Sequence, residues 1–307
     1  MSKKKIAIVT MSFKEDFKEC ELLCKSIDIF VPEEIVHYIF VPDKDYHLFQ
    51  AYHYGQHKIR KESEILPKWL IKLPFKVAGR HFHVSPFTFP VRGWIIQQIC
   101  KLGIFEVIDE DIDAVFNCDS ESVFIQPFNY DYLVKGENYA MYQSDSSYPP
   151  GHEDFCKAAK HLLRINDDIS SISQHDYITE LVCFERENVT KLLNGIASNH
   201  IFGNWKMALC NTKRFSEYYL YGIYTGMMQS GNNHFLIDKK IFYQISVDEY
   251  NSKDLFENKI RDVMPDSEII GLWLQKTSRR KLSHTYLDFD AKKSVLESIW
   301  KSTTQLS

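Results

Sequence analysis

Two carboxylates that flank one small residue stand near the middle of the chain. Asp119 and Glu121 lie on either side of Ser120, directly after the apolar run AVFNC at residues 114–118. A short apolar run that ends in a polar turn is typical of a buried strand. Carboxylate oxygens are the ligands that Mg²⁺ and Mn²⁺ prefer, and these ions also bind substrate phosphates. The spacing therefore predicts that Asp119 and Glu121 bind Mn²⁺ or Mg²⁺, with Ser120 contacting the same ligand.

Polar residues at two other places could hold the rest of a phosphate-bearing ligand. Thr10, Ser12 and Lys14 lie at or just after the apolar run at residues 6–10. Ligands of parallel sheets bind outside the carboxyl ends of the strands, so these residues are candidate nucleotide contacts. The predicted helix over residues 90–103 adds Arg92, Trp94, Gln97, Gln98 and Lys101. An arginine fork suits phosphate, whereas a plain loop and a solvated helix face are the alternative interpretations.

A parallel sheet is needed to bring these residues together. Apolar runs at residues 6–10 and 36–41 flank a helical pattern at residues 16–30, which predicts a right-handed βαβ unit. Further strands are predicted at residues 114–118, 123–125, 139–142, 177–184 and 201–202. Further helices are predicted at residues 90–103, 152–164, 215–228 and 291–300, with a basic turn at 276–281. Strands that alternate with helices in this way indicate the α/β class.

Residues 62–90 mix basic, aromatic and proline residues without a clean period. This composition predicts a long irregular loop that borders the site, because loops of this length in compact domains usually have a function. Its basic residues, among them Lys72, Lys76 and Arg80, could face a phosphate-bearing acceptor or a membrane surface. The alternative is a solvated basic loop with a few aromatic anchors.

Composition excludes several classes of protein. A net charge of −4 over 307 residues provides no basic field for non-specific nucleic-acid binding. The seven cysteines include no C-x-x-C pair, which favours buried free thiols in a reducing compartment. The N-terminal apolar run is cut short by Lys14, Glu15 and Asp16, so it reads as a strand and not as a signal peptide. No apolar run approaches the ~18 residues of a membrane span.

The acidic turn carries a family resemblance. The segment DSESVFIQPF, residues 119–128, resembles the metal-binding Asp-x-Asp region of GT-A-fold glycosyltransferases, with Glu121 where a second Asp is more usual. Three further segments are similar to an uncharacterised group of bacterial GT-A-like proteins. They read IAIVTMSFKEDF, RGWIIQQICKLG and FSEYYLYGIY.

The resemblance implies a Rossmann-type, mixed and mostly parallel sheet flanked by helices, in one domain over residues 1–307 with a helical C-terminal part. Residues 1–130 would bind a nucleotide sugar, a UDP-sugar foremost, and residues 131–307 a saccharide or lipid-linked acceptor. The implied activity is metal-assisted glycosyl transfer in bacterial surface polysaccharide or lipopolysaccharide synthesis. The implied location is the cytoplasm, with peripheral contact at the inner face of the cell membrane.

An inverting transferase also needs a carboxylate that takes the proton of the acceptor hydroxyl. The resemblance implies Glu217 for this role. Asp154 is the second choice on its residue type alone, and a helix-capping acid is the alternative for each. A retaining enzyme would not need this base. Two other classes remain open: a nucleotidyltransferase, which lacks support from any glycine-rich phosphate loop, and a non-catalytic protein that binds a sugar or a nucleotide.

Overall fold

The computed structural model describes residues 4–144, 148–165, 175–227, 233–246, 252–275 and 287–304. A five-stranded sheet with the order β11-β7-β1-β2-β3 forms its centre. The strands are β1 (Ile6–Met11), β2 (Val36–Val41), β3 (His57–Lys61), β7 (Ala114–Cys118) and β11 (Leu181–Glu185). Four of them run parallel, and β11 pairs antiparallel with β7 at one edge. The predicted mixed, mostly parallel sheet is therefore confirmed.

The sequence of β1 explains why this strand lies at the centre. Successive side chains of a strand point to opposite faces. Ala7 and Val9 join the core on one face of the sheet, and Ile6 and Ile8 join the core on the other. A strand with both faces covered needs a nearly continuous apolar run, and residues 6–11 provide one in which only Thr10 is polar.

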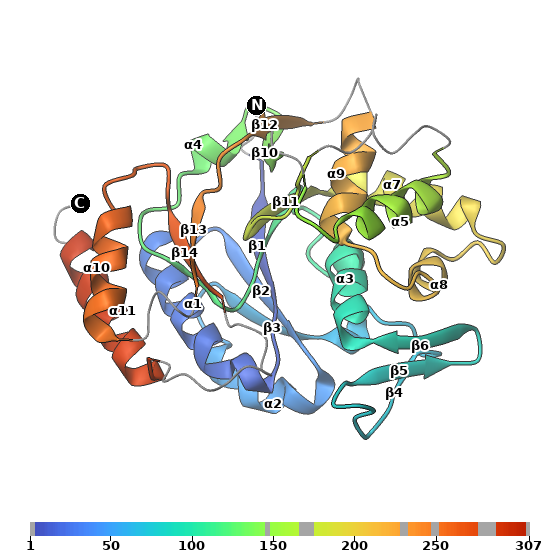
Figure 1. Cartoon of the computed structure of the whole chain (residues 1–307), viewed down its shortest axis with the longest axis horizontal. Helices are drawn as coiled ribbons and strands as arrows, with labels where there is room; N and C mark the ends of the chain where they lie inside the picture. The colour runs from blue at the N-terminus through green and yellow to red at the C-terminus, as the bar shows by residue number, and fades with distance from the viewer. Residues whose placement is uncertain are drawn as a thin grey trace.

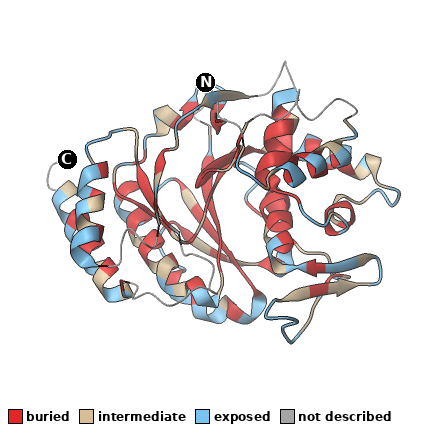
Figure 2. Ribbon diagram, in the orientation of Figure 1, coloured by how far each residue is buried: buried red, intermediate tan, exposed pale blue. Residues whose placement is uncertain are grey.

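Helices cover both faces of the sheet, as Figure 1 shows. One face packs against α3 (Gly93–Gly103), α5 (Glu153–Leu163), α7 (Arg186–Asn199), α8 (Trp205–Cys210) and α9 (Glu217–Met227). The opposite face packs against α1 (Phe17–Phe30), α4 (Tyr130–Leu133), α10 (Lys253–Val263) and α11 (Phe289–Thr304). The short helix α2 (Tyr46–Phe49) packs beside α1 over β2 and β3. Figure 2 shows the buried residues concentrated in the central strands and on the inner sides of these helices. The helical C-terminal part is confirmed by α10 and α11.

Three small sheets surround the central one. The first has the order β13-β14-β8 and comprises β8 (Ser122–Phe124), β13 (Phe242–Ser246) and β14 (Gly271–Gln275). The second has the order β12-β10-β9 and comprises β9 (Val134–Lys135), β10 (Asn138–Tyr142) and β12 (His234–Ile237). The third has the order β4-β5-β6 and comprises β4 (Ile71–Lys72), β5 (Phe82–Ser85) and β6 (Thr88–Arg92). It projects from one end of the molecule in Figure 1.

The prediction of an irregular loop over residues 62–90 is wrong, because this segment forms the antiparallel β4–β6 sheet. Much of this sheet is exposed, so its strands lack the apolar alternation that identifies a strand in the sequence. Pro90 lies in the edge strand β6, where a missing N–H is tolerated, and α3 begins three residues later. The strand β3 was not predicted, since its sequence HKIRK is mostly polar.

Two other predicted strands need correction. Residues 201–202 form a turn between α7 and α8, where Ile201 and Phe202 are exposed and Gly203 N–H donates to His200 O. The strand predicted from residue 177 begins only at Leu181. The predicted basic turn at 276–281 lies outside the described residues.

The seven cysteines are free and buried, as predicted. Within the described ranges, no helix has both the length and the apolarity that crossing a membrane requires.

Candidate functional site

The order of the central strands locates a crevice between β1 and β7. From β1 the chain adds β2 and β3 on one side, and it then returns to place β7 on the other side of β1. In open parallel sheets, ligands bind outside the carboxyl ends of the strands where the strand order reverses in this way. β1 ends at Met11 and β7 ends at Cys118, so the acidic turn after Cys118 lies at the expected place.

A cavity of about 270 Å³, here called the acidic cavity, opens at these strand ends. Its lining residues are Met11, Phe13, Asp16, Gln97, Lys101, Asp119, Ser120, Glu121 and Trp273. The acidic turn is fixed by two backbone hydrogen bonds. Ser122 N–H donates to Asp119 O over 3.0 Å, and Leu274 N–H of β14 donates to Glu121 O over 2.9 Å. The turn therefore presents Asp119 and Glu121 to one cavity.

Lys101 of α3 connects the acidic cavity to the core. Its Nζ lies 3.2 Å from Asp119 Oδ1 and 3.2 Å from Glu217 Oε1, and it donates to Tyr218 Oη over 2.7 Å. Burial lowers the pKa of Lys101, but Asp119, Tyr218 and Glu217 outweigh it and raise that pKa well above its ordinary value. Lys101 is therefore a fixed positive charge at the floor of the acidic cavity.

Glu217 lies behind Lys101, at the start of α9. Only 2% of its side chain is exposed, and it is not among the residues that line the acidic cavity. Its backbone N–H donates to Gln98 Oε1 over 3.0 Å, which connects α9 to α3. Burial raises the pKa of Glu217 against the opposing effect of Lys101. In this arrangement the carboxylate can reach a ligand only through Lys101.

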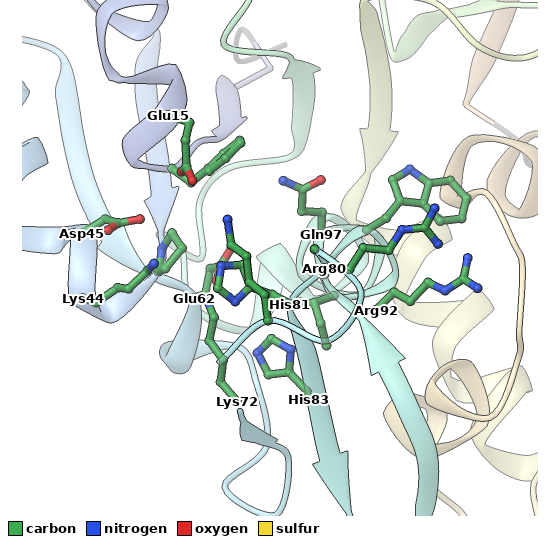
Figure 3. Close-up of a pocket in the computed structure, with 17 residues that line it drawn as sticks. Glu15, Lys44, Asp45, Glu62, Lys72, Arg80, His81, His83, Arg92 and Gln97 are labelled. Atoms are coloured by element: carbon green, nitrogen blue, oxygen red, sulfur yellow. The ribbon is translucent and has the colours of Figure 1, made fainter. Parts of the chain in front are cut away.

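A second cavity, of about 500 Å³, adjoins the first and shares Phe13 and Gln97 with it. We call it the basic cavity, because five lysines and arginines and three carboxylates line it. The charged lining residues are Lys44, Lys72, Lys76, Arg80 and Arg92, with Glu15, Asp45 and Glu62. Figure 3 shows Gln97, Arg80 and Arg92 on one side, with Glu15, Lys44 and Asp45 on the opposite side. The β4–β6 sheet thus closes the cavity over the carboxyl ends of β1, β2 and β3.

Two histidines of the basic cavity are neutral at neutral pH. Burial and Lys72 lower the pKa of His83 to about 4, and burial with nearby lysines lowers the pKa of His81. His83 is 4% exposed, yet its Nδ1 has no hydrogen-bond partner among the described residues. A buried polar atom without a partner is uncommon in native proteins. Since His83 lines the cavity (Figure 3), a bound ligand could supply this partner.

The acidic cavity fits a divalent cation that also binds phosphate. Asp119 is 47% exposed at its side chain, and Glu121 and Asp16 line the same space, so three carboxyl residues surround one cavity. Mg²⁺ is usually held by one or two carboxylates together with substrate phosphates, and not by a closed protein cage. Within the described ranges, three ligating side chains with all ligand atoms within 4.8 Å of one another occur elsewhere, at Cys24, His37 and His57. The acidic cavity therefore offers a partial ligand set.

The structure brings part of the predicted site together. Asp119, Ser120, Glu121 and Lys101 line the acidic cavity, Arg92 and Trp94 line the basic cavity, and Gln97 lines both. The other predicted residues line neither. Thr10 is buried between strands, where its hydroxyl donates to Cys118 O over 2.8 Å. Ser12 and Gln98 are buried. Lys14 is exposed, and its backbone N–H donates to the Asp45 carboxylate.

Asp154 lies apart from both cavities. Its Oδ2 atom lies 3.2 Å from Arg214 Nη1. Asp154 lines a different cavity, of about 1280 Å³, between α5 and the segment after α8. Phe13 falls within the stretch from Thr10 to Lys14 that the strand-end rule selected, whereas sequence reasoning missed Asp16 and Trp273. The same rule, extended by two residues, could have included Asp16. Trp273 comes from β14, and no local pattern connects that strand to the acidic turn.

Several solved structures match this chain at low similarity. Mouse xyloside xylosyltransferase 1, in its apo form, matches with a TM-score of 0.46 and 7% identity, over 92% of this chain and 100% of that one. The apo-form glycosyltransferase GlyE of Streptococcus pneumoniae TIGR4 matches with a TM-score of 0.44 and 10% identity. This match covers 99% of this chain, which spans 64% of the GlyE chain.

A galactosyltransferase, LgtC, in complex with donor and acceptor sugar analogs, matches with a TM-score of 0.44 and 10% identity, over 95% of each chain. No curated protein matches the sequence. The model of a family of unknown function, DUF6492, matches residues 3–259. Because this match covers most of the 307 residues, the chain belongs to the family of unknown function DUF6492.

Proposed function

We propose that this protein is a glycosyltransferase that moves a sugar from a nucleotide-sugar donor to a saccharide or lipid-linked acceptor. The observation that carries the proposal is that Asp119, Glu121 and Lys101 line one cavity, at the point where the strand order reverses. Carboxylates and a fixed cation at this place suit a metal-bound diphosphate. The sequence resemblance to GT-A enzymes supports the same reaction class.

Asp119 and Glu121 would hold Mn²⁺ or Mg²⁺, which when bound would neutralise the charge of the leaving diphosphate. Lys101 is anchored by Glu217 and Tyr218, so its ammonium cannot leave the cavity floor without breaking buried contacts. Its role would be to orient Asp119 toward the ion and to keep the acidic cavity from accumulating uncompensated negative charge.

The basic cavity would bind the remainder of the phosphate-bearing ligand. Arg80 and Arg92 can each present a planar fork to a phosphate. Trp94 is 44% exposed and lines the same space, which leaves its ring available to a sugar or a base. The predicted division into a donor half at residues 1–130 and an acceptor half at 131–307, within one domain, is part of this proposal.

The identity of the acceptor base belongs to the proposal as well. The sequence favours Glu217, with Asp154 second, but Glu217 is buried behind Lys101 and Asp154 lines another cavity. We therefore assign Glu217 as a positioning residue that acts through Lys101. Asp154 would act only on an acceptor that extends to the cavity beside Arg214.

The biological setting is proposed from the resemblance. A UDP-sugar donor, bacterial surface polysaccharide or lipopolysaccharide synthesis, and a cytoplasmic location follow from the group of proteins that the sequence resembles. Peripheral membrane contact has additional support in the β4–β6 sheet. Ile71, Phe75 and Phe89 are 61%, 59% and 68% exposed there, and Lys72 and Lys76 directly follow Ile71 and Phe75 in the sequence. Exposed apolar side chains next to lysines fit an anionic lipid surface.

Calorimetric titration of UDP, GDP, ADP and CMP, with and without Mn²⁺, tests the donor site. We expect metal-dependent binding of one nucleotide by the wild type and its loss in Asp119→Ala. Asp111→Ala is the matched control, since Asp111 is exposed near the other end of β7 and pairs with Lys5. If the folded wild type binds none of these nucleotides with either Mn²⁺ or Mg²⁺, the donor-site proposal is wrong and a non-catalytic role is favoured.

The products distinguish the second enzyme class. A glycosyltransferase releases a nucleoside diphosphate or monophosphate and leaves the sugar on the acceptor. Given the same nucleotide sugar, a nucleotidyltransferase would instead move the nucleoside monophosphate to the acceptor and release sugar 1-phosphate. Phosphorus NMR of a reaction with the nucleotide sugar that binds best would separate these outcomes.

A further inference from the structure

Cys24, His37 and His57 form a buried cluster beneath α1 that the proposed transferase site does not use. One ligand atom from each residue lies within 4.8 Å of the other two, and the three residues are at most 1% exposed. His37 of β2 and His57 of β3 are direct partners in the parallel strand register. Their Nδ1 atoms are 2.9 Å apart, so the two rings face each other through the same type of nitrogen.

The outer nitrogen of each ring has its own partner. His57 Nε2 lies 2.9 Å from Asp28 Oδ1, and His37 Nε2 lies 2.9 Å from Thr10 Oγ1. Histidines that bind metals usually donate the N–H that faces away from the metal to a carboxylate or another oxygen, which fixes the ring and its tautomer. The cluster therefore has the outer contacts of a metal site as well as a set of ligands.

The hydrogen-bond partners of the two imidazole rings determine which of their nitrogens carry protons. The Thr10 hydroxyl donates its proton to Cys118 O over 2.8 Å, so His37 Nε2–H must donate to Thr10. His57 Nε2–H donates to the Asp28 carboxylate. A neutral imidazole carries one proton, and both Nδ1 atoms are then lone pairs that face each other at 2.9 Å. Only a cation in the gap, a metal ion or an additional proton, makes this arrangement attractive.

We propose that Cys24, His37 and His57 bind one Zn²⁺ ion. Zn²⁺ prefers thiolate and imidazole ligands in a tetrahedral arrangement, whereas Mg²⁺ and Mn²⁺ prefer oxygen, so this site differs in chemistry from the acidic cavity. Tetrahedral Zn–N bonds place two nitrogens about 3.4 Å apart, so the rings need to separate by about 0.5 Å. Cys20 lies one turn before Cys24, and the two thiols are hydrogen-bonded to each other. Cys20 is the candidate fourth ligand.

The bound ion would join three elements that lie apart in the sequence. It would link α1 to β2 and to β3. The strand β3 lies at the edge of the central sheet, and its sequence HKIRK is mostly polar. Through Thr10 and Cys118 O the same cluster contacts the residue that precedes Asp119. Because the cluster is buried, we expect the ion to bind as the chain folds, with release of the thiol proton.

Metal analysis of the full-length protein tests this proposal. The protein is expressed with added zinc, and the metal content of the purified chain is measured by mass spectrometry. We expect about one zinc per chain in the wild type and in Cys183→Ser, a matched variant of another buried free thiol. We expect no zinc above background in Cys24→Ser. A Cys24→Ser protein that retains the zinc would assign the ion to another site and overturn the proposal.

Refolding of the wild type provides a test that does not depend on variants. The chain is unfolded in a denaturant that contains a chelator. It is then refolded with Zn²⁺, with Co²⁺ or without metal. We expect a higher melting temperature with Zn²⁺ and the charge-transfer absorption of a cobalt–thiolate bond with Co²⁺. If the wild type folds equally well in all three conditions and takes up neither metal, a shared proton occupies the gap and the proposal is wrong.

Discussion

The Lys101 ammonium lies 3.2 Å from the Glu217 carboxylate, in an ion pair whose side chains are 10% and 2% exposed. Removing one partner of a buried ion pair leaves an uncompensated charge and costs about 3–5 kcal/mol of stability. We expect Lys101→Met to lower the free energy of unfolding by this amount in urea denaturation. The double variant Lys101→Met/Glu217→Gln should lose less, because it no longer buries a carboxylate that can ionise. If Glu217→Gln costs the same in the wild type as in Lys101→Met, the two side chains are not coupled.

Glu217→Gln separates a positioning role from a role as the acceptor base. If Glu217 acts through Lys101, the variant should lower kcat, keep the acidic limb of the pH–rate profile and leave donor binding nearly unchanged. If Glu217 is the base, turnover should fall by about 10²–10⁴-fold and the acidic limb should disappear. Asp154→Asn serves as the comparison, and ordinary turnover in both variants would remove both residues from the mechanism.

Glu62 should make the stability of the protein depend on pH. Burial raises the pKa of this carboxyl from 4.5 to about 7. The folded state therefore binds the proton more tightly than the unfolded state, and the resulting stability is complete below pH 4.5 and lost as the pH rises through 7. The shift corresponds to about 3 kcal/mol.

Urea denaturation of Glu62→Gln between pH 4.5 and 8 measures this effect. The variant should match the wild type at the low end and exceed its stability at the high end, because glutamine cannot ionise. Glu15→Gln is the control, since Glu15 lines the same cavity but is exposed. A constant difference between Glu62→Gln and the wild type across this range would contradict the assignment.

The exposed apolar residues of the β4–β6 sheet should determine membrane binding. We expect co-sedimentation with vesicles that contain anionic lipid, weaker binding at high salt, and several-fold weaker binding of Phe75→Ser/Phe89→Ser. Leu255→Ser is the control, because Leu255 is 51% exposed on α10, at the far end of the molecule from this sheet (Figure 1). Binding that is unchanged in the double variant would assign membrane contact, if any, to another surface.

The central strands and the place of the acidic turn could be predicted from local sequence patterns. β1, β2 and β7 are buried on both faces, so each needs a nearly continuous apolar run, and such runs are visible without a structure. The βαβ unit and the polar turn after Cys118 then put Asp119 and Glu121 at a strand end. Burial of the cysteines also followed from their apolar neighbours and the absence of C-x-x-C pairs.

Which side chains meet could not be predicted, because it depends on how distant elements pack. Lys101 and Glu217 are 116 residues apart, and their contact depends on how α3 and α9 pack. His37 and His57 face each other because β2 and β3 pair in one register, which the polar sequence of β3 does not reveal. The β4–β6 sheet has much of its surface exposed, so its apolar residues leave no periodic signal. Local pattern identifies elements by their burial, whereas the site depends on contacts between elements that no local pattern encodes.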